Sequence, residues 1–380
     1  MSDAFPPRPN RRRILVGAAG LVGMAGFGGI AAFRAAAASR GLMLRTRAGL
    51  AFGTTVALTA AGTDAAVIEA ALTEGFAAMR AVEAAASLFR PDSALSRLNR
   101  DGALEAPDPH LVVLLRFALS LADETGGAFD PTVQPLWPVW AGAAARGERP
   151  EAGVLHAVLG TIGWQRVRLD EDRITLVPGT ALTLNALIQG YAADRVMAAL
   201  WNHGIADAFV DTGEFGASGT HPDGTPWRLG LADPRDTATL DAVIAPFTGF
   251  AATSGDYNMS FSNDRADHHI FDPATGYSPG GLASVTVTAP TGLRADGLST
   301  ACMVLGRDRG ARLVAGHAGC AVRFTDKPRA ACLKLRPRGP RRGIGRPPDR
   351  ACRTPPTGPR PRRGGSLRSS RFPPPPRPRS

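Results

Sequence analysis

The sequence predicts an α+β protein in which one mixed α/β domain covers about residues 41–326. Stretches with helical spacing of apolar residues and stretches with β-type alternation interleave along this part of the chain. They do so without a strict strand–helix–strand repeat, and the sequence shows no internal repeat. A single domain of mixed secondary structure follows from these two observations.

Apolar spacing together with end signals predicts three helices. The alanine-rich segment 64–87 starts at Asp64, a residue type that caps helix N-termini. A second helix covers 110–124 and ends at two glycines, and a third covers 189–203 and ends at Gly204.

Three short stretches are predicted to be strands. "SVTVTAP" (284–290) alternates in the β manner, "WRLGLADP" (227–234) does so roughly, and "DAFVDTGE" (207–214) runs into a turn.

The first 40 residues have the order of an export signal. A basic cluster at Arg11–Arg13 precedes an uncharged run from Ile14 to Phe33, and small residues follow. Paired arginines and a glycine-rich run favour the twin-arginine route, so we expect a periplasmic protein that uses that export machinery. The alternative is a single membrane helix, because an uncharged run of about 20 residues can just span a bilayer.

Residues 327–380 differ in kind from the domain. Arg, Pro and Gly dominate them, and apolar periodicity is almost absent, so this tail is expected to be disordered. It is either a basic arm for anionic surfaces or an out-of-frame translation of GC-rich DNA, and we favour the second interpretation.

The charge of +11 comes from the two ends of the chain. Of 44 basic and 33 acidic residues, residues 1–40 hold six and one, and residues 327–380 hold 17 and one. The domain between them therefore carries a net charge of about −10, which argues against a nucleic-acid partner. The four cysteines form no CxxC pair and indicate neither a zinc site nor a disulfide framework.

Two stretches read as turns that could line a cleft. In "ASLFRPDSALSRLNR" (86–100), polar side chains either project into a cleft or cap the next helix. "TGGAFDPTVQPLWPVW" (125–140) is an irregular aromatic loop. It suits a planar ring ligand, or it packs its own tryptophans into the core.

Two further stretches bring polar groups to turns. In "TLNALIQGYAADRV" (183–196), a helix start could hold phosphate oxygens on free N–H groups, although no GxGxxG or P-loop is present. In "VDTGEFGASG" (210–219), Asp211 and Glu214 are either an acid–base pair or turn formers.

The stretch "LRADGLSTACMVLG" (293–306) combines two oxygen ligands with an apolar helix. Asp296 and Thr300 lie four residues apart and share one helix face. An aspartate at the head of a buried helix needs a partner. It either caps the helix or binds Mg²⁺, which takes few protein oxygens and fills its other positions with water or phosphate.

These stretches together resemble the FAD:protein FMN transferases, the ApbE family, over about Phe52 to Val322. Nine blocks occur in order: "LFRPDSALSRLN", "GAFDPTVQPLW", "TLNALIQGYAADRV", "DTGE", "WRLGLADP", "ATSGDY", "HHIFDPATGY", "SVTVTAP" and "ADGLSTACMVLG". The twin-arginine start and the "TLN…QG" and "DTGE" forms resemble the NosX branch, which serves nitrous oxide reductase maturation by flavinylating the membrane protein NosR.

The resemblance implies a reaction and a fold of the ApbE type. Such enzymes split FAD at the pyrophosphate, release AMP and attach FMN to a threonine or serine hydroxyl of a target protein. Mg²⁺ stabilises charge on the phosphoryl oxygens.

The resemblance also implies site residues. Metal ligands fall on Asp296, Thr300 and the carbonyl of Ala186. His269 is a candidate to assist proton removal from the hydroxyl, with Asp272 and Pro273 fixing the turn that aims it, while a solvated turn histidine is the alternative. His268 is only a neighbour in this interpretation. The implied flavin-nucleotide contacts are Phe52, Phe89, Ala128, Phe129, Asp130, Thr183, Gln189 and Ile270.

Five residues of the third block depart from the family pattern, and Phe52 stands where the family usually has Met. Thr183 stands where the family has Asp, Gln189 where it has Lys, and Ala186-Leu187-Ile188 where it has Gly-Ile-Ala. The added bulk is expected to narrow the FAD cleft, because glycine permits closer backbone approach than leucine. A non-catalytic flavin-binding assembly factor, or an FAD pyrophosphatase, is therefore the alternative function.

Overall fold

The computed structural model describes residues 41–327. The predicted export signal and all of the predicted tail except Lys327 lie outside the described residues. Between residues 41 and 327, no helix has the length and apolar character needed to cross a membrane.

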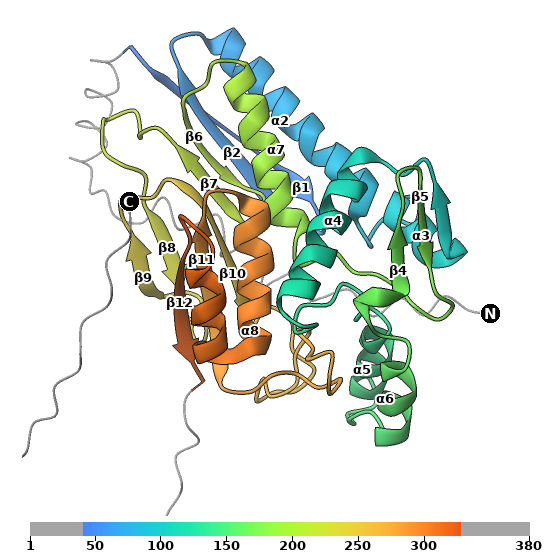
Figure 1. The fold of residues 1–380 in the computed structure, drawn as a ribbon. Helices are drawn as coiled ribbons and strands as arrows, with labels where there is room; N and C mark the ends of the chain where they lie inside the picture. Colours follow the sequence, from blue (N-terminus) through green and yellow to red (C-terminus); the bar gives the residue numbers. More distant parts are fainter. Residues whose placement is uncertain (1–40, 328–380) are drawn as a thin grey trace, which may run out of the picture. The chain divides into compact units, whose positions relative to one another are not determined.

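A seven-stranded sheet forms the centre of the described fold (Figure 1). Its order is β1-β2-β6-β7-β10-β11-β12, and every neighbouring pair is antiparallel. The most buried strand is β11, which has almost no exposed residue because both of its faces are covered. The strands span Met43–Ala51 (β1), Thr54–Gly62 (β2), Asp207–Asp211 (β6), Phe215–Ser218 (β7), Gly249–Gly255 (β10), Leu282–Ala289 (β11) and Ala321–Asp326 (β12).

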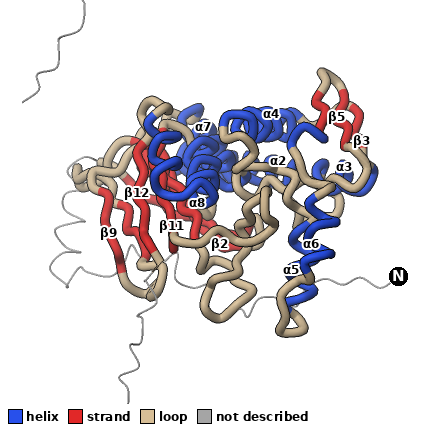
Figure 2. The backbone as a smooth tube through the Cα atoms, turned by 60° about the horizontal axis from the view of Figure 1, so that its bottom comes forward, coloured by secondary structure: helices blue, strands red, loops and turns tan. Residues whose placement is uncertain are grey.

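Three long helices cover one face of this sheet: α2 (Ala65–Ala86), α7 (Ile188–Asn202) and α8 (Gly292–Ala315) (Figures 1 and 2). The main core lies between them and the sheet, and α4 (Pro109–Glu124) packs on α2 and α8. Asp64 caps α2, since its side chain accepts a hydrogen bond from Ala66 N at 2.7 Å. The three helices predicted from apolar spacing are confirmed to within two residues at each end.

The opposite face of the sheet has its own small core. Phe209 of β6 points away from the helices and packs against Trp227 and Phe247. The two-stranded sheet of β8 (Leu229–Ala232) and β9 (Leu240–Ile244) contributes further apolar side chains to this cluster. The predicted strands 207–214, 227–234 and 284–290 correspond to β6, β8 and β11.

The segment between α2 and α7 adds smaller elements beside the main layers. They are α3 (Ala94–Asp101), α5 (Leu136–Ala144), α6 (Ala152–Leu159), the 3₁₀ turn η2 (Trp164–Arg166), and a three-stranded sheet of β3 (Ala103–Glu105), β5 (Arg173–Leu176) and β4 (Val167–Leu169). Antiparallel strands with helices gathered on one face confirm the α+β prediction.

Candidate functional site

The N-termini of α7 and α8 cross at two glycines. A Cβ atom on Gly190 would stand 2.2 Å from the carbonyl oxygen of Gly292, so no other residue allows this approach. Each helix supplies an aspartate to the first turn of the other. Asp194 of α7 accepts from Gly292 N at 2.6 Å and Leu293 N at 2.9 Å, and Asp296 of α8 accepts from Gly190 N at 3.0 Å. The two helix starts therefore cap each other.

This arrangement corrects the simplest interpretation of Asp296. The residue does not cap its own helix, because Thr291 is the N-cap of α8 and accepts from Arg294 N. Leu187 at the start of α7 provides no side-chain cap, so Asp296 supplies one from the neighbouring helix. One carboxylate oxygen makes that bond, and no further hydrogen bond to the Asp296 side chain is present within residues 41–327.

The turn between β6 and β7 packs against the start of α7. Thr212 Oγ donates to the carbonyl of Gln189 at 2.8 Å, and a Cβ on Gly213 would overlap the Gln189 side chain. Asp211 accepts from Gly213 N at 2.9 Å. It is therefore a turn former, which was one of the two alternatives predicted for Asp211 and Glu214. Glu214 is instead buried and accepts from Thr253 N of β10 at 3.0 Å.

Strand β10 places the hydroxyl of Ser254 beside that of Thr300. The Oγ of Ser254 lies 2.8 Å from the Thr300 Oγ and 2.8 Å from that of Ser299. Four segments thus converge: the start of α7 with Gln189 and Gly190, the β6–β7 turn, β10, and the start of α8 with Asp296 and Thr300.

Three carboxyl groups of this region have raised pKa values, so burial penalises their charged forms. Burial raises the pKa of Asp296 to about 7 and that of Asp211 to about 6. Burial, with Asp296 nearby, raises the pKa of Glu214 well above its usual range. Within residues 41–327, no Lys, Arg or His forms an ion pair with any of these three carboxylates.

The donor set fits a hard cation with few protein ligands. In the described part of the chain, no three His, Cys, Asp or Glu side chains are placed to hold a metal ion. The predicted set is of another type: one carboxylate, one hydroxyl on the same helix face, and one carbonyl. Such oxygen ligands suit Mg²⁺, which keeps water or phosphate in its remaining positions, and a cation would offset the buried charge.

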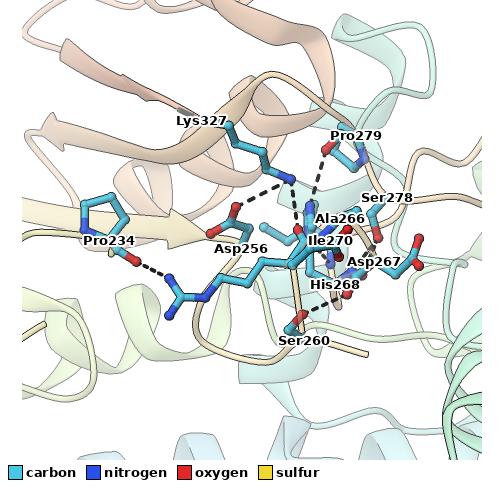
Figure 3. A network of polar contacts seen from close by, with 12 residues as sticks. Pro234, Asp256, Ser260, Ala266, Asp267, His268, Ile270, Ser278, Pro279 and Lys327 are labelled. Atoms are coloured by element: carbon cyan, nitrogen blue, oxygen red, sulfur yellow. Dashed lines mark hydrogen bonds and ion pairs between the residues drawn. The ribbon is translucent and has the colours of Figure 1, made fainter. Parts of the chain in front are cut away.

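The loop that follows β10, residues 256–281, carries the two neighbouring histidines. Asp256 at its start is fully buried and binds Arg235 through two bonds of 2.7 and 2.8 Å. Lys327 lies 3.4 Å from the same carboxylate and donates to the carbonyl of Arg265 at 3.0 Å (Figure 3). Further along the loop, Asp267 binds Arg149 through two bonds.

His269 is held by one carbonyl of this loop. Both its backbone N–H and its ring Nδ1 lie within hydrogen-bond distance of Met259 O, at 3.2 and 3.1 Å. A carbonyl only accepts, so Nδ1 carries the proton and Nε2 keeps its lone pair. Burial lowers the pKa of His269, which favours this neutral form. Asp272 forms the turn that follows, since it accepts from Ala274 N at 2.9 Å and its carbonyl accepts from Gly276 N at 2.8 Å.

Replacing Arg235 with alanine is expected to lower the free energy of unfolding by about 3 kcal/mol, because it leaves a buried carboxylate with only Lys327 as a cationic partner. Urea unfolding followed by circular dichroism measures this change. Arg100→Ala, which breaks an exposed pair with Asp101, is the matched control and should leave stability unchanged. Equal stability of the two variants would contradict the anchoring role.

Comparison with known proteins shows to which family the chain belongs. A model of the ApbE family matches residues 52–324. The chain belongs to the ApbE family. It is 33% identical over 248 residues to the FAD:protein FMN transferase of Haemophilus influenzae, a match that covers 61% of this chain and 72% of that protein. It is 31% identical to the FAD:protein FMN transferase of Treponema pallidum, over 68% of this chain and 78% of that protein.

Solved structures of the ApbE family share the fold. The flavinyl transferase ApbE of Pseudomonas stutzeri superposes with a TM-score of 0.65 at 32% identity, covering 76% of this chain and 92% of that one. The flavin transferase ApbE of Vibrio cholerae gives a TM-score of 0.64 at 27% identity, covering 74% of this chain and 93% of that one.

The predicted flavin contacts of this ApbE family member differ in exposure. Phe89 is 65% exposed and faces Gly53, so its ring is free for a ligand. Phe52 is 7% exposed and packs in the main core. It has φ +53° at the first position of the two-residue β1–β2 turn, and its N–H donates to Glu83 at 2.8 Å. Phe129 and Ile270 are also buried.

The predicted contacts at Ala128, Asp130 and Thr183 lie in neighbouring loops. Thr183 N donates to Pro131 O at 2.8 Å, which joins the third block to the second. Asp130 is buried and accepts from Thr132 and from Trp164 N, so both of its oxygens serve the loop. The flavin contacts stay predictions.

One expectation is corrected. The bulk at Leu187 and Ile188 does not narrow the cleft, because both side chains are buried in the core and Leu187 fills the space beside Gly297. For the aromatic loop 125–140, Trp140 follows the second of the two alternatives, in which the loop packs its tryptophans into the core. It is buried, stacks with Phe261, and donates to Gly276 O at 2.8 Å.

Spacing alone missed the anchors of the site. Asp194, Arg235 and Asp256 were not predicted, since each acts on a segment that is distant in sequence. For Asp194 the sequence offered one signal, an acidic residue among the mostly apolar residues of "GYAADRV".

Proposed function

We propose that this chain is an FAD:protein FMN transferase that attaches FMN to a threonine or serine hydroxyl of a target protein and releases AMP. The names of its relatives support this activity, and the geometry adds a physical reason. A group of carboxyl and hydroxyl oxygens lies at the crossing of α7 and α8, and the loop with His268 and His269 follows β10, whose Ser254 contacts Thr300.

Asp296, Thr300 and the Ala186 carbonyl would hold Mg²⁺, which when bound supplies positive charge beside the pyrophosphate oxygens of FAD. The free Nε2 of His269 accepts the proton of the incoming hydroxyl. The hydroxyl oxygen then bonds to the phosphorus on the flavin side. The bond from that phosphorus to the bridging oxygen breaks, and AMP leaves with the bridging oxygen.

The target and compartment extend this proposal. The "TLN…QG" and "DTGE" forms and the twin-arginine start favour a periplasmic enzyme that flavinylates a NosR-like membrane protein during nitrous oxide reductase maturation. Export through the twin-arginine route would deliver the protein folded to that compartment.

The test is incubation of the purified protein with FAD, MgCl₂ and a threonine peptide from the flavinylation segment of a NosR-like protein. We expect AMP together with a peptide that gains the mass of FMN and fluoresces as a flavin. Equal release of AMP and free FMN without an adduct would instead indicate an FAD pyrophosphatase. Tight FAD binding without AMP release would indicate the non-catalytic assembly factor.

A further inference from the structure

We infer that His268 is a positioning residue for the reaction, which acts by orienting the neighbouring His269 and does not itself touch substrate. The inference rests on the proposed function, in which His269 accepts the proton. It gives a role to a histidine that sequence reasoning treated as a mere neighbour.

The His268 ring is fully buried and bridges two limbs of the loop. Its Nε2 lies 3.3 Å from the carbonyl of Pro279, and its Nδ1 lies 3.4 Å from Ile270 N (Figure 3). Since the carbonyl only accepts and the N–H only donates, Nε2 carries the proton and Nδ1 accepts. His268 and His269 are thus neutral tautomers of opposite kind.

The backbone of His268 is fixed on both sides. Ser278 Oγ accepts from His268 N at 2.7 Å and donates to His268 O at 2.6 Å. On the other side, Ser260 pairs with His268 in an isolated antiparallel bridge, next to the Met259 carbonyl that holds His269. A shift of His268 therefore moves the His269 ring relative to that carbonyl.

Charged groups around the ring keep it neutral. Burial and the nearby Lys327 lower the pKa of His268 to about 4, which outweighs the opposing effect of Asp256. An imidazole that stays neutral at working pH keeps Nδ1 as an acceptor for Ile270 N–H. A residue in this state suits a fixed structural bridge better than proton transfer.

The test compares His268→Leu, which keeps the volume but removes both ring bonds, with His268→Gln, whose amide can still donate to Pro279 O. In the full-length protein with FAD, MgCl₂ and the threonine peptide, we expect His268→Leu to lower kcat roughly 10- to 100-fold with KM for FAD unchanged. We expect His268→Gln to retain most of the wild-type kcat. Ser278→Ala, which removes the two backbone bonds, should lower kcat in the same way and serves if His268→Leu fails to fold.

Two further measurements separate positioning from direct chemistry. The acid limb of the pH–kcat profile should persist in His268→Leu, and its loss would make His268 the proton acceptor and overturn the inference. In the His269→Ala background, His268→Leu should add no further loss, because a positioning residue acts only through its neighbour.

Other results also count against the role. An unchanged kcat in both His268→Leu and Ser278→Ala would overturn it, as would a change in KM alone. An unimpaired His269→Ala variant would instead refute the proton-acceptor assignment in the proposed function.

Discussion

Replacing Asp296 with asparagine is expected to abolish FMN transfer and, in the absence of metal, to make the protein more stable. The amide oxygen can still accept from Gly190 N, so the crossing of α7 and α8 is kept. The negative charge that would bind Mg²⁺ is lost. We expect the rate of AMP release to fall roughly 10³-fold, as when one main source of charge stabilisation is removed from an active site.

The stability effect has the opposite sign because the carboxylate is buried next to Glu214 and Asp194. Its folded-state pKa of about 7 lies above the ordinary 3.8, so ionisation penalises the folded state as pH rises from 4. Asparagine removes that penalty. The gain should be roughly 1 kcal/mol or more at pH 8 and should nearly vanish at pH 4.

Calorimetric titration with MgCl₂ and urea unfolding in EDTA measure the two effects separately. Asp308→Asn, at an exposed position of α8 beyond its kink at Gly306, is the control and should change neither. An Asp296→Asn protein that binds Mg²⁺ like wild type would remove this residue from the metal site, whatever its activity.

The sequence predicted the helices that have strong end signals. Asp64 and the glycines after residues 124 and 203 mark α2, α4 and α7 because capping and helix termination are local effects. No strand was predicted for residues 43–62, although β1 and β2 lie there. Alanine, glycine and arginine make up half of the residues in these strands, and such residues carry little β-type signal.

In the candidate site, too, local features were predicted from the sequence and tertiary contacts were not. The pairing of Asp296 with Thr300 was predicted, because a spacing of four residues fixes a shared helix face. Their partners were not. Gly190 lies 106 residues from Asp296 and Ser254 lies 46 from Thr300, and only tertiary packing brings them together. The local sequence likewise does not predict that His268 is held between two limbs of one loop.

The crossing of α7 and α8 and the candidate site both require that residue 190 has no Cβ atom. Substituting alanine would place a Cβ 2.2 Å from the Gly292 carbonyl oxygen and 2.7 Å from the Asp296 Cβ, and the first of these is backbone that cannot rotate away. The two helix starts would have to separate, which breaks the bond from Gly190 N to Asp296. We expect the free energy of unfolding to fall by about 3 kcal/mol or more, and transfer activity to be lost with it.

Gly153 of α6 provides a matched control for this substitution. It is also a helical glycine, but an added Cβ would meet nothing within 4 Å, so Gly153→Ala should stabilise the protein by up to about 1 kcal/mol. Urea unfolding of both variants and calorimetric Mg²⁺ titration separate general effects of alanine from the local clash. A Gly190→Ala protein with wild-type stability and cation affinity would show that α7 and α8 do not need this close approach. The reciprocal capping by Asp194 and Asp296 would then no longer account for the position of the metal ligands.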